Sequence, residues 1–165
     1  MDLTIHTPLD STNLMMFVDD DEDDILLFSR ALGDSGVEFQ LVIAHDGKEA
    51  IEYLLQPNKS LFPLPRWIIT DIKMPLLTGF QLLQRVKESE LKKIPVVLLS
   101  SSSHPDDLFR AYSNGADGYL VKPSHLDGMK QLWQALRNYC DGLGPLANDE
   151  LANFLPTGSK SSDQS

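Results

Sequence analysis

Five short apolar runs alternate along this chain with segments whose apolar residues recur at helical spacing, and this alternation constrains the fold more than any other feature. Strands that alternate with helices are typical of a parallel sheet whose crossover helices cover both faces. We expect strands at about 14–18, 39–44, 67–71, 95–100 and 118–121. We expect helices at about 23–33, 47–55, 77–88, 106–114 and 125–140. The sequence therefore predicts an α/β domain with a single parallel sheet.

The length of 165 residues suits one well-buried core and is short for two ordinary domains. The alternating segments occupy about 13–141, which we expect to be the folded domain. Residues 1–12 precede it as an N-terminal extension. After the linker-like run 142–145 the chain becomes polar, so we expect 142–165 to be a largely flexible C-terminal extension.

Several broad classes of protein are disfavoured by composition. A net charge of −10 opposes binding to nucleic acid, whose phosphates attract Lys and Arg. No apolar stretch approaches the roughly 20 residues that a membrane span needs, and the first residues do not resemble a secretory signal. The single cysteine, Cys140, permits no internal disulfide. We therefore expect a cytoplasmic protein with no membrane segment.

Carboxylates end two of the predicted strands. Asp71 follows the run 67–70, and Asp19 and Asp20 follow the run 14–18. Ligands of an open parallel sheet bind beyond the carboxyl ends of its strands, so we expect these three acids to converge on a hard cation. The acidic residues that follow, 21–24, would by themselves suit a solvated segment. Because apolar runs flank them, we expect these acids to lie at the positive start of the first helix, where negative charge is favourable. They need not be metal ligands.

The fourth and fifth predicted strands end in further polar residues, Ser100 and Lys122. Each has an ordinary structural explanation, as a strand-end hydroxyl and a surface lysine. In order and spacing, however, residues from about 13 to 140 resemble the receiver domain of two-component response regulators. The segments that carry the resemblance are Asp19-Asp20, Asp71-Ile72-Lys73-Met74-Pro75, Ser100-Ser101 and Gly118-Tyr119-Leu120-Val121-Lys122-Pro123.

The resemblance implies a flavodoxin-like (βα)5 three-layer sandwich whose five strands lie in the order 2-1-3-4-5. The switch point of that order falls between the first and third strands, which are the two that end in carboxylates. The resemblance also implies that Asp71 is the phosphoacceptor and that Lys122 binds the phosphoryl group. Mg²⁺ is the implied cofactor, because a few carboxylate and carbonyl oxygens suit it. Its expected ligands are Asp20, Asp71 and the backbone carbonyl of Lys73, with Asp19 acting through water.

Signalling is implied to depend on the Ser100 hydroxyl and the Tyr119 ring. Phosphorylation would draw Ser100 toward the new oxygens, and the Tyr119 ring would turn inward. The readout is expected on the face of the fourth helix, fifth strand and fifth helix, which is also a possible homodimer surface. The family's Lys-Pro peptide bond is cis, so we expect the same at Lys122-Pro123.

The implied function is that of a stand-alone receiver, which is not an enzyme and accepts its phosphoryl group from a histidine kinase or phosphotransfer protein. Its downstream protein partner is not specified by the sequence. The proline-containing loop 56–66 and the extended carboxyl end resemble the regulators that partner bacterial phytochromes, which is one subgroup among several.

Two other functions stay open. One is a Mg²⁺-dependent phosphatase with a phospho-aspartyl intermediate, which would need an acid two positions after the nucleophile, where this chain has Lys73. The other is a receiver-like binding module that has lost phosphorylation. Such modules usually lack one of the acids, the hydroxyl or the lysine, and all of these are present.

Overall fold

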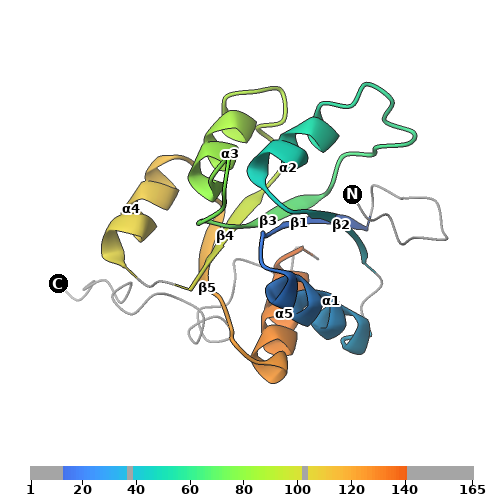
Figure 1. Ribbon diagram of the computed structural model, residues 1–165, viewed down its shortest axis with the longest axis vertical. Coiled ribbons are helices and arrows are strands. Elements are labelled where there is room, and N and C mark those ends of the chain that lie inside the picture. The colour runs from blue at the N-terminus through green and yellow to red at the C-terminus, as the bar shows by residue number, and fades with distance from the viewer. Residues whose placement is uncertain (1–12, 37–38, 102–103, 141–165) are drawn as a thin grey trace.

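The computed structural model describes residues 13–36, 39–101 and 104–140 (Figure 1). The strands are β1 Leu14–Val18, β2 Gln40–Ala44, β3 Trp67–Asp71, β4 Val96–Ser100 and β5 Gly118–Val121. The helices are α1 Glu22–Asp34, α2 Gly47–Leu54, α3 Gly79–Lys87, α4 Pro105–Ser113 and α5 Leu126–Cys140. The predicted extensions, 1–12 and 142–165, lie outside these residues, so the division of the chain into domain and extensions stays a prediction.

The five strands form one parallel sheet in the order β2-β1-β3-β4-β5, as predicted. Helices α1 and α5 cover one face of the sheet, and α2, α3 and α4 cover the other (Figure 1). This arrangement confirms the predicted three-layer α/β fold. Among the described residues, none of the helices combines the length and the apolar character needed to span a bilayer.

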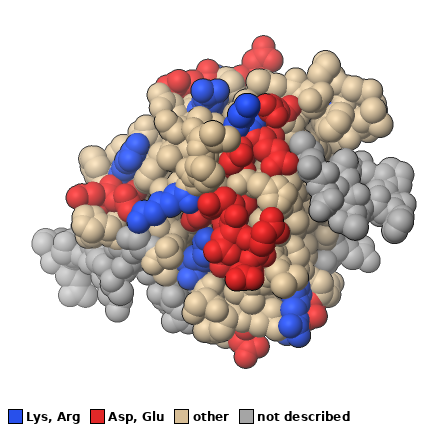
Figure 2. All heavy atoms as spheres, in the orientation of Figure 1, with Lys and Arg blue, Asp and Glu red and all other residues tan. Residues whose placement is uncertain are grey.

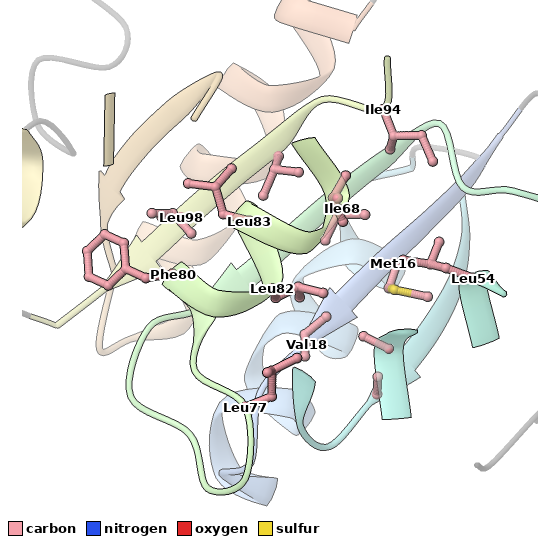
Figure 3. Packing of buried hydrophobic residues seen from close by; sticks show 14 of the residues in the cluster. Met16, Val18, Leu54, Ile68, Leu77, Phe80, Leu82, Leu83, Ile94 and Leu98 are labelled. Carbon is pink, nitrogen blue, oxygen red and sulfur yellow. The ribbon is translucent and has the colours of Figure 1, made fainter. Parts of the chain in front are cut away.

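Alternate residues of each strand enter different halves of the core. All five residues of β1 are buried. Met16 packs toward α2 and α3, together with Leu82 and Leu83 of α3 (Figure 3), whereas Phe17 packs toward α1 and α5. Because a strand buried on both faces has no solvated side, its sequence is a continuous apolar run rather than an alternating one.

The predicted helix boundaries are wrong by one or two residues where a cap decides the start. We predicted that α3 begins at 77, but it begins at Gly79 because Thr78 forms a capping box with Gln81. The Asp21 carboxylate accepts from the N–H groups of the first turn of α1, so that helix begins at Glu22 rather than at 23.

Candidate functional site

Three carboxylates meet where β1 and β3 end. The two strands are neighbours, with Val18 opposite Thr70, so Asp19 and Asp71 leave the sheet side by side. Together with Asp20, each offers an oxygen, and these three oxygens lie within 4.8 Å of one another. Figure 2 shows acidic side chains gathered near the middle of the face that it presents, with basic side chains beside them. The predicted convergence of these three acids is therefore present in the structure.

The backbone fixes each acid differently. Asp19 is fully buried, and its N–H donates to the Ala44 carbonyl at 3.1 Å. Its Oδ1 accepts from the N–H of Asp21 at 3.0 Å. Asp20 is exposed. One carboxylate is thus held in a fixed orientation inside the domain, whereas its neighbour faces solvent.

The loop after β3 keeps Asp71 at the edge of the sheet. Gly79, the first residue of α3, donates its N–H to the Ile72 carbonyl at 2.9 Å. A Cβ at Gly79 would overlap the backbone oxygen of Asp71. Only glycine permits this approach, which brings the start of α3 directly against the end of β3.

Lys122 reaches the acids from the end of β5. Its N–H donates to the Ser100 carbonyl at 2.7 Å, which joins the ends of β4 and β5. Its Nζ lies 2.8 Å from Asp19 Oδ2 and 3.5 Å from Asp71 Oδ1. The lysine side chain is only 9% exposed, so the charge is held within the site rather than in bulk solvent.

Burial is the main influence on the charges of these groups. It raises the pKa of Asp71 from 3.8 to about 6, against the lowering effect of Lys122 and with a further rise from Asp19. Burial also raises the pKa of Asp19, although hydrogen bonds from Lys122 and Asp21 oppose the rise. The pKa of Lys122 is raised, because its bonds to carboxylates outweigh its own desolvation. When ionised, the three carboxylates carry more negative charge than the single Lys122 ammonium can offset.

A divalent cation fits this excess of negative charge. Magnesium prefers oxygen ligands and is bound through one or two carboxylates while it keeps several waters. The three carboxylate oxygens supply hard ligands of that kind, and Asp20 leaves one side open to solvent. Lys73 follows in the loop after β3 with its side chain exposed, and a ligand role for its carbonyl stays a prediction.

Ser100 and Tyr119 lie together on adjacent strands. Ser100 is 5% exposed and Tyr119 is fully buried. Burial raises the pKa of the Tyr119 hydroxyl, and a hydrogen bond with the Ser100 side chain opposes that rise. The ring is buried in this structure, and its inward turn on phosphorylation stays a prediction.

Two findings differ from the sequence analysis. The peptide bond between Lys122 and Pro123 is trans, so the predicted cis bond is wrong, and Lys122 reaches both Asp19 and Asp71 without it. Sequence reasoning also missed Asp24 as a partner of the lysine. Its Oδ2 lies 2.8 Å from Lys122 Nζ. The acidic run 21–24 is no specific signal for this contact, because acids in a first helical turn are favoured whether or not one of them bonds a lysine.

Fold and site together define a doubly wound α/β domain with a group of three carboxylates and a lysine at the carboxyl edge of its sheet. Residues 15–134 match the response regulator receiver domain, and the chain belongs to that family. The chain is 44% identical over 110 residues to the two-component response regulator ORR3 of rice (Oryza sativa), covering 66% of this chain and 79% of ORR3.

Solved structures show the same likeness. The phosphorylated cyanobacterial phytochrome response regulator RcpA is 30% identical with a TM-score of 0.71, over 80% of this chain and 96% of RcpA. The Mn(2+)-bound form of response regulator Rcp1 is 29% identical with a TM-score of 0.68, over 77% of this chain and 93% of Rcp1. The sequence-based recognition of a response regulator receiver is confirmed.

Proposed function

We propose that Asp71 accepts a phosphoryl group from a histidine kinase or a phosphotransfer protein, with Mg²⁺ as cofactor. The observation that carries this proposal is the convergence of three carboxylate oxygens within 4.8 Å, with a lysine ammonium 3.5 Å from Asp71. A carboxylate at the end of β3 is a nucleophile that needs no general base once it is ionised.

Transfer from a phosphohistidine to Asp71 needs no further reactant. An ionised oxygen of Asp71 attacks phosphorus, and the bond from phosphorus to the donor nitrogen breaks with its electron pair leaving on the imidazole. The Lys122 ammonium offsets negative charge that builds on the phosphoryl oxygens. Asp19, Asp20 and Asp71 would hold Mg²⁺, which would supply further positive charge beside those oxygens. The donor enters from the solvent side, where Asp20 is exposed.

Ser100 and Tyr119 would convert the new charge into a change of structure. Phosphorylation adds about −1.5 to −2 charges at the acceptor. The Ser100 hydroxyl would then donate to a phosphoryl oxygen and give up its bond with Tyr119. The Tyr112 hydroxyl of α4 is itself bonded to the Tyr119 backbone, so the change would reach α4. The face formed by α4, β5 and α5 is therefore the proposed surface for a downstream protein or a second copy of this chain.

The similarity to RcpA favours a phytochrome-type histidine kinase as the donor. The single cysteine fits a reducing compartment, and we propose the cytoplasm. The acidic composition opposes direct binding to nucleic acid.

Labelling with acetyl phosphate and Mg²⁺ tests the proposal. We expect the wild type to gain one phosphoryl group, Asp71→Asn to gain none, and the exposed Asp127→Asn to behave as the wild type. Intact-protein mass spectrometry measures the gain. Labelling of Asp71→Asn at the wild-type rate would contradict the acceptor assignment. Sustained hydrolysis of varied phosphomonoesters would instead support the phosphatase alternative, which Lys73 disfavours.

A further inference from the structure

A carboxylate outside the proposed chemistry holds Lys122. The lysine Nζ lies 2.8 Å from Asp24 Oδ2 and 2.8 Å from Asp19 Oδ2, but 3.5 Å from Asp71 Oδ1. An ammonium group has three donors, and its strong bonds to carboxylates are about 2.7–2.9 Å long. Two donors are thus engaged by Asp19 and Asp24, and the contact with the proposed acceptor is the longest of the three.

Backbone hydrogen bonds fix the place of Asp24. The Asp21 N–H donates to Asp19 Oδ1 at 3.0 Å, and Asp21 Oδ1 accepts from the N–H of Asp24 at 3.2 Å. With the two lysine bonds, these contacts close a ring from Asp19 through Asp21 and Asp24 to Lys122 and back. The first turn of α1 therefore presents the Asp24 carboxylate to the ammonium as a consequence of its cap.

The two partners of the ammonium differ in how readily they can be exchanged. Asp19 is completely buried and is held by a backbone N–H, whereas the Asp24 side chain is 29% exposed and can be solvated if the lysine leaves it. Among the described residues, the carboxylate group that could bind a metal comprises Asp19, Asp20 and Asp71 and does not include Asp24. Asp24 therefore acts on the lysine and not as a further metal ligand.

We propose that Asp24 is a positioning residue that holds the Lys122 ammonium back from Asp71 and competes with a phosphoryl oxygen for it. This inference rests on the proposed phosphoacceptor role of Asp71. To form an equally short bond, a phosphoryl oxygen at Asp71 has to draw the ammonium toward itself and away from Asp24, so this acid slows phosphoryl transfer. The acidic run after β1 then regulates the site as well as starting a helix.

The test compares Asp24→Asn with Asp23→Asn. The two acids are adjacent in the first turn of α1, and each variant removes one charge, but no ion pair among the described residues involves the exposed Asp23 carboxylate. The labelling rate is measured against acetyl phosphate concentration at constant Mg²⁺. We expect the second-order rate constant to rise about fivefold in Asp24→Asn, the order expected when one charge leaves a partly screened site. In Asp23→Asn it should rise less than about twofold, because that charge is exposed and better screened.

A Lys122→Ala background separates positioning from a general charge effect. If Asp24 acts through the lysine, Asp24→Asn should change the labelling rate of Lys122→Ala no more than Asp23→Asn does. A fivefold rise that persists without the lysine would overturn the proposal. So would equal rates in Asp24→Asn and Asp23→Asn, or slower labelling in Asp24→Asn.

Hydrogen exchange of the lysine ammonium gives a readout that needs no phosphoryl transfer. In protein with ¹⁵N-labelled lysine, two short bonds should slow exchange of the Lys122 ammonium protons with water. Asp24→Asn should accelerate that exchange, and Asp23→Asn should not. Unchanged exchange in Asp24→Asn would overturn the proposal. Failure of the wild type to be labelled by acetyl phosphate, with the exchange result as expected, would contradict the phosphoacceptor role and leave the holding of Lys122 by Asp24 established.

Discussion

Helix α4 is packed less closely than α1 and α5, which lie on the opposite face of the sheet. On the α1–α5 side, the Phe17 and Phe28 rings stack with centroids 3.8 Å apart, and Trp133 of α5 lies 4.5 Å from Phe28. The Trp133 Nε1–H also donates to the Phe28 carbonyl at 3.1 Å. On the other side, α4 buries one residue, Ala111. Phe109 of α4 is 77% exposed.

This difference indicates where a change at the site can travel. A closely packed aromatic cluster resists displacement, because any shift forfeits many contacts at once. A helix with few buried contacts can move at low cost in free energy. Asp19 and Asp24 lie at the start of the packed α1 side, whereas Ser100 and Tyr119 adjoin α4. We therefore expect the lysine and metal groups to stay fixed while α4 moves.

The largest expected effect is the loss of stability when the aromatic cluster between the sheet and helices α1 and α5 is disrupted. Trp133→Ala removes a fully buried ring and its hydrogen bond with the Phe28 carbonyl, so it should lower the free energy of unfolding by about 3–5 kcal/mol. Phe109→Ala should change it by no more than about 0.5 kcal/mol, because that ring is exposed. Urea unfolding measures both. Similar losses in the two variants would refute the difference in packing between α5 and α4.

A second effect concerns the pH dependence of stability at the three carboxylates where β1 and β3 end. The pKa of Asp71 is raised from 3.8 to about 6, so the stability that this group contributes is complete below about pH 4 and is lost as the pH rises through 6. Asp71→Asn avoids this loss. Without Mg²⁺ it should be more stable than the wild type by up to roughly 3 kcal/mol at pH 8, because one pKa unit corresponds to about 1.4 kcal/mol.

The gain from Asp71→Asn should shrink as the pH falls from 8 toward 4. Unfolding in urea at several pH values, with a chelator present, measures the gain. A gain that does not depend on pH would show that ionisation of Asp71 is not its cause. Saturating Mg²⁺ should reduce the gain at pH 8, since the metal stabilises the ionised form.

The sequence predicts the sheet well, because its signals are local. The bounds of β1, β3 and β5 agree with the structure, since each apolar run meets a charged residue at or just past its end: Asp19, Asp71 and Lys122. The same feature brings those residues to one edge of the sheet, as parallel strands require. Helix starts are less certain from sequence alone, because side chains such as Thr78 decide them.

Contacts between distant elements were not predictable from the same signals. Asp24 and Lys122 are 98 residues apart, and their pairing depends on how the first turn of α1 is placed beside the end of β5. The acidic run predicts a helix start equally well whether or not one of its acids bonds a lysine. The inward position of Tyr119 likewise depends on its rotamer, which strand periodicity does not determine.

A third and smaller effect, stabilisation by Mg²⁺, tests whether the three converging carboxylates bind the metal. Mg²⁺ at tenfold its dissociation constant should stabilise the wild type by about 1.4 kcal/mol, because binding to the folded state alone shifts the unfolding equilibrium. Asp20→Asn should gain less at the same concentration, since one of the three converging oxygens loses its charge. Asp23→Asn, with the same loss of charge, should gain as much as the wild type. Thermal unfolding with and without Mg²⁺ measures these gains, and equal gains in all three proteins would contradict the metal site.

The smallest expected effect tests the α4 side. Tyr119→Phe removes the hydroxyl that is bonded to Ser100 and leaves a buried serine without this partner, so it should cost about 1 kcal/mol of stability. Amide hydrogen exchange should become faster in α4 at low denaturant, while amides of α1 and α5 change only as much as global stability does. Tyr53→Phe, which removes another buried hydroxyl bond, to the Pro63 carbonyl and away from α4, is the matched control and should not change exchange in α4 selectively. Faster exchange spread evenly over α1, α4 and α5 would contradict this prediction. It would show that α4 does not open independently of the rest of the domain.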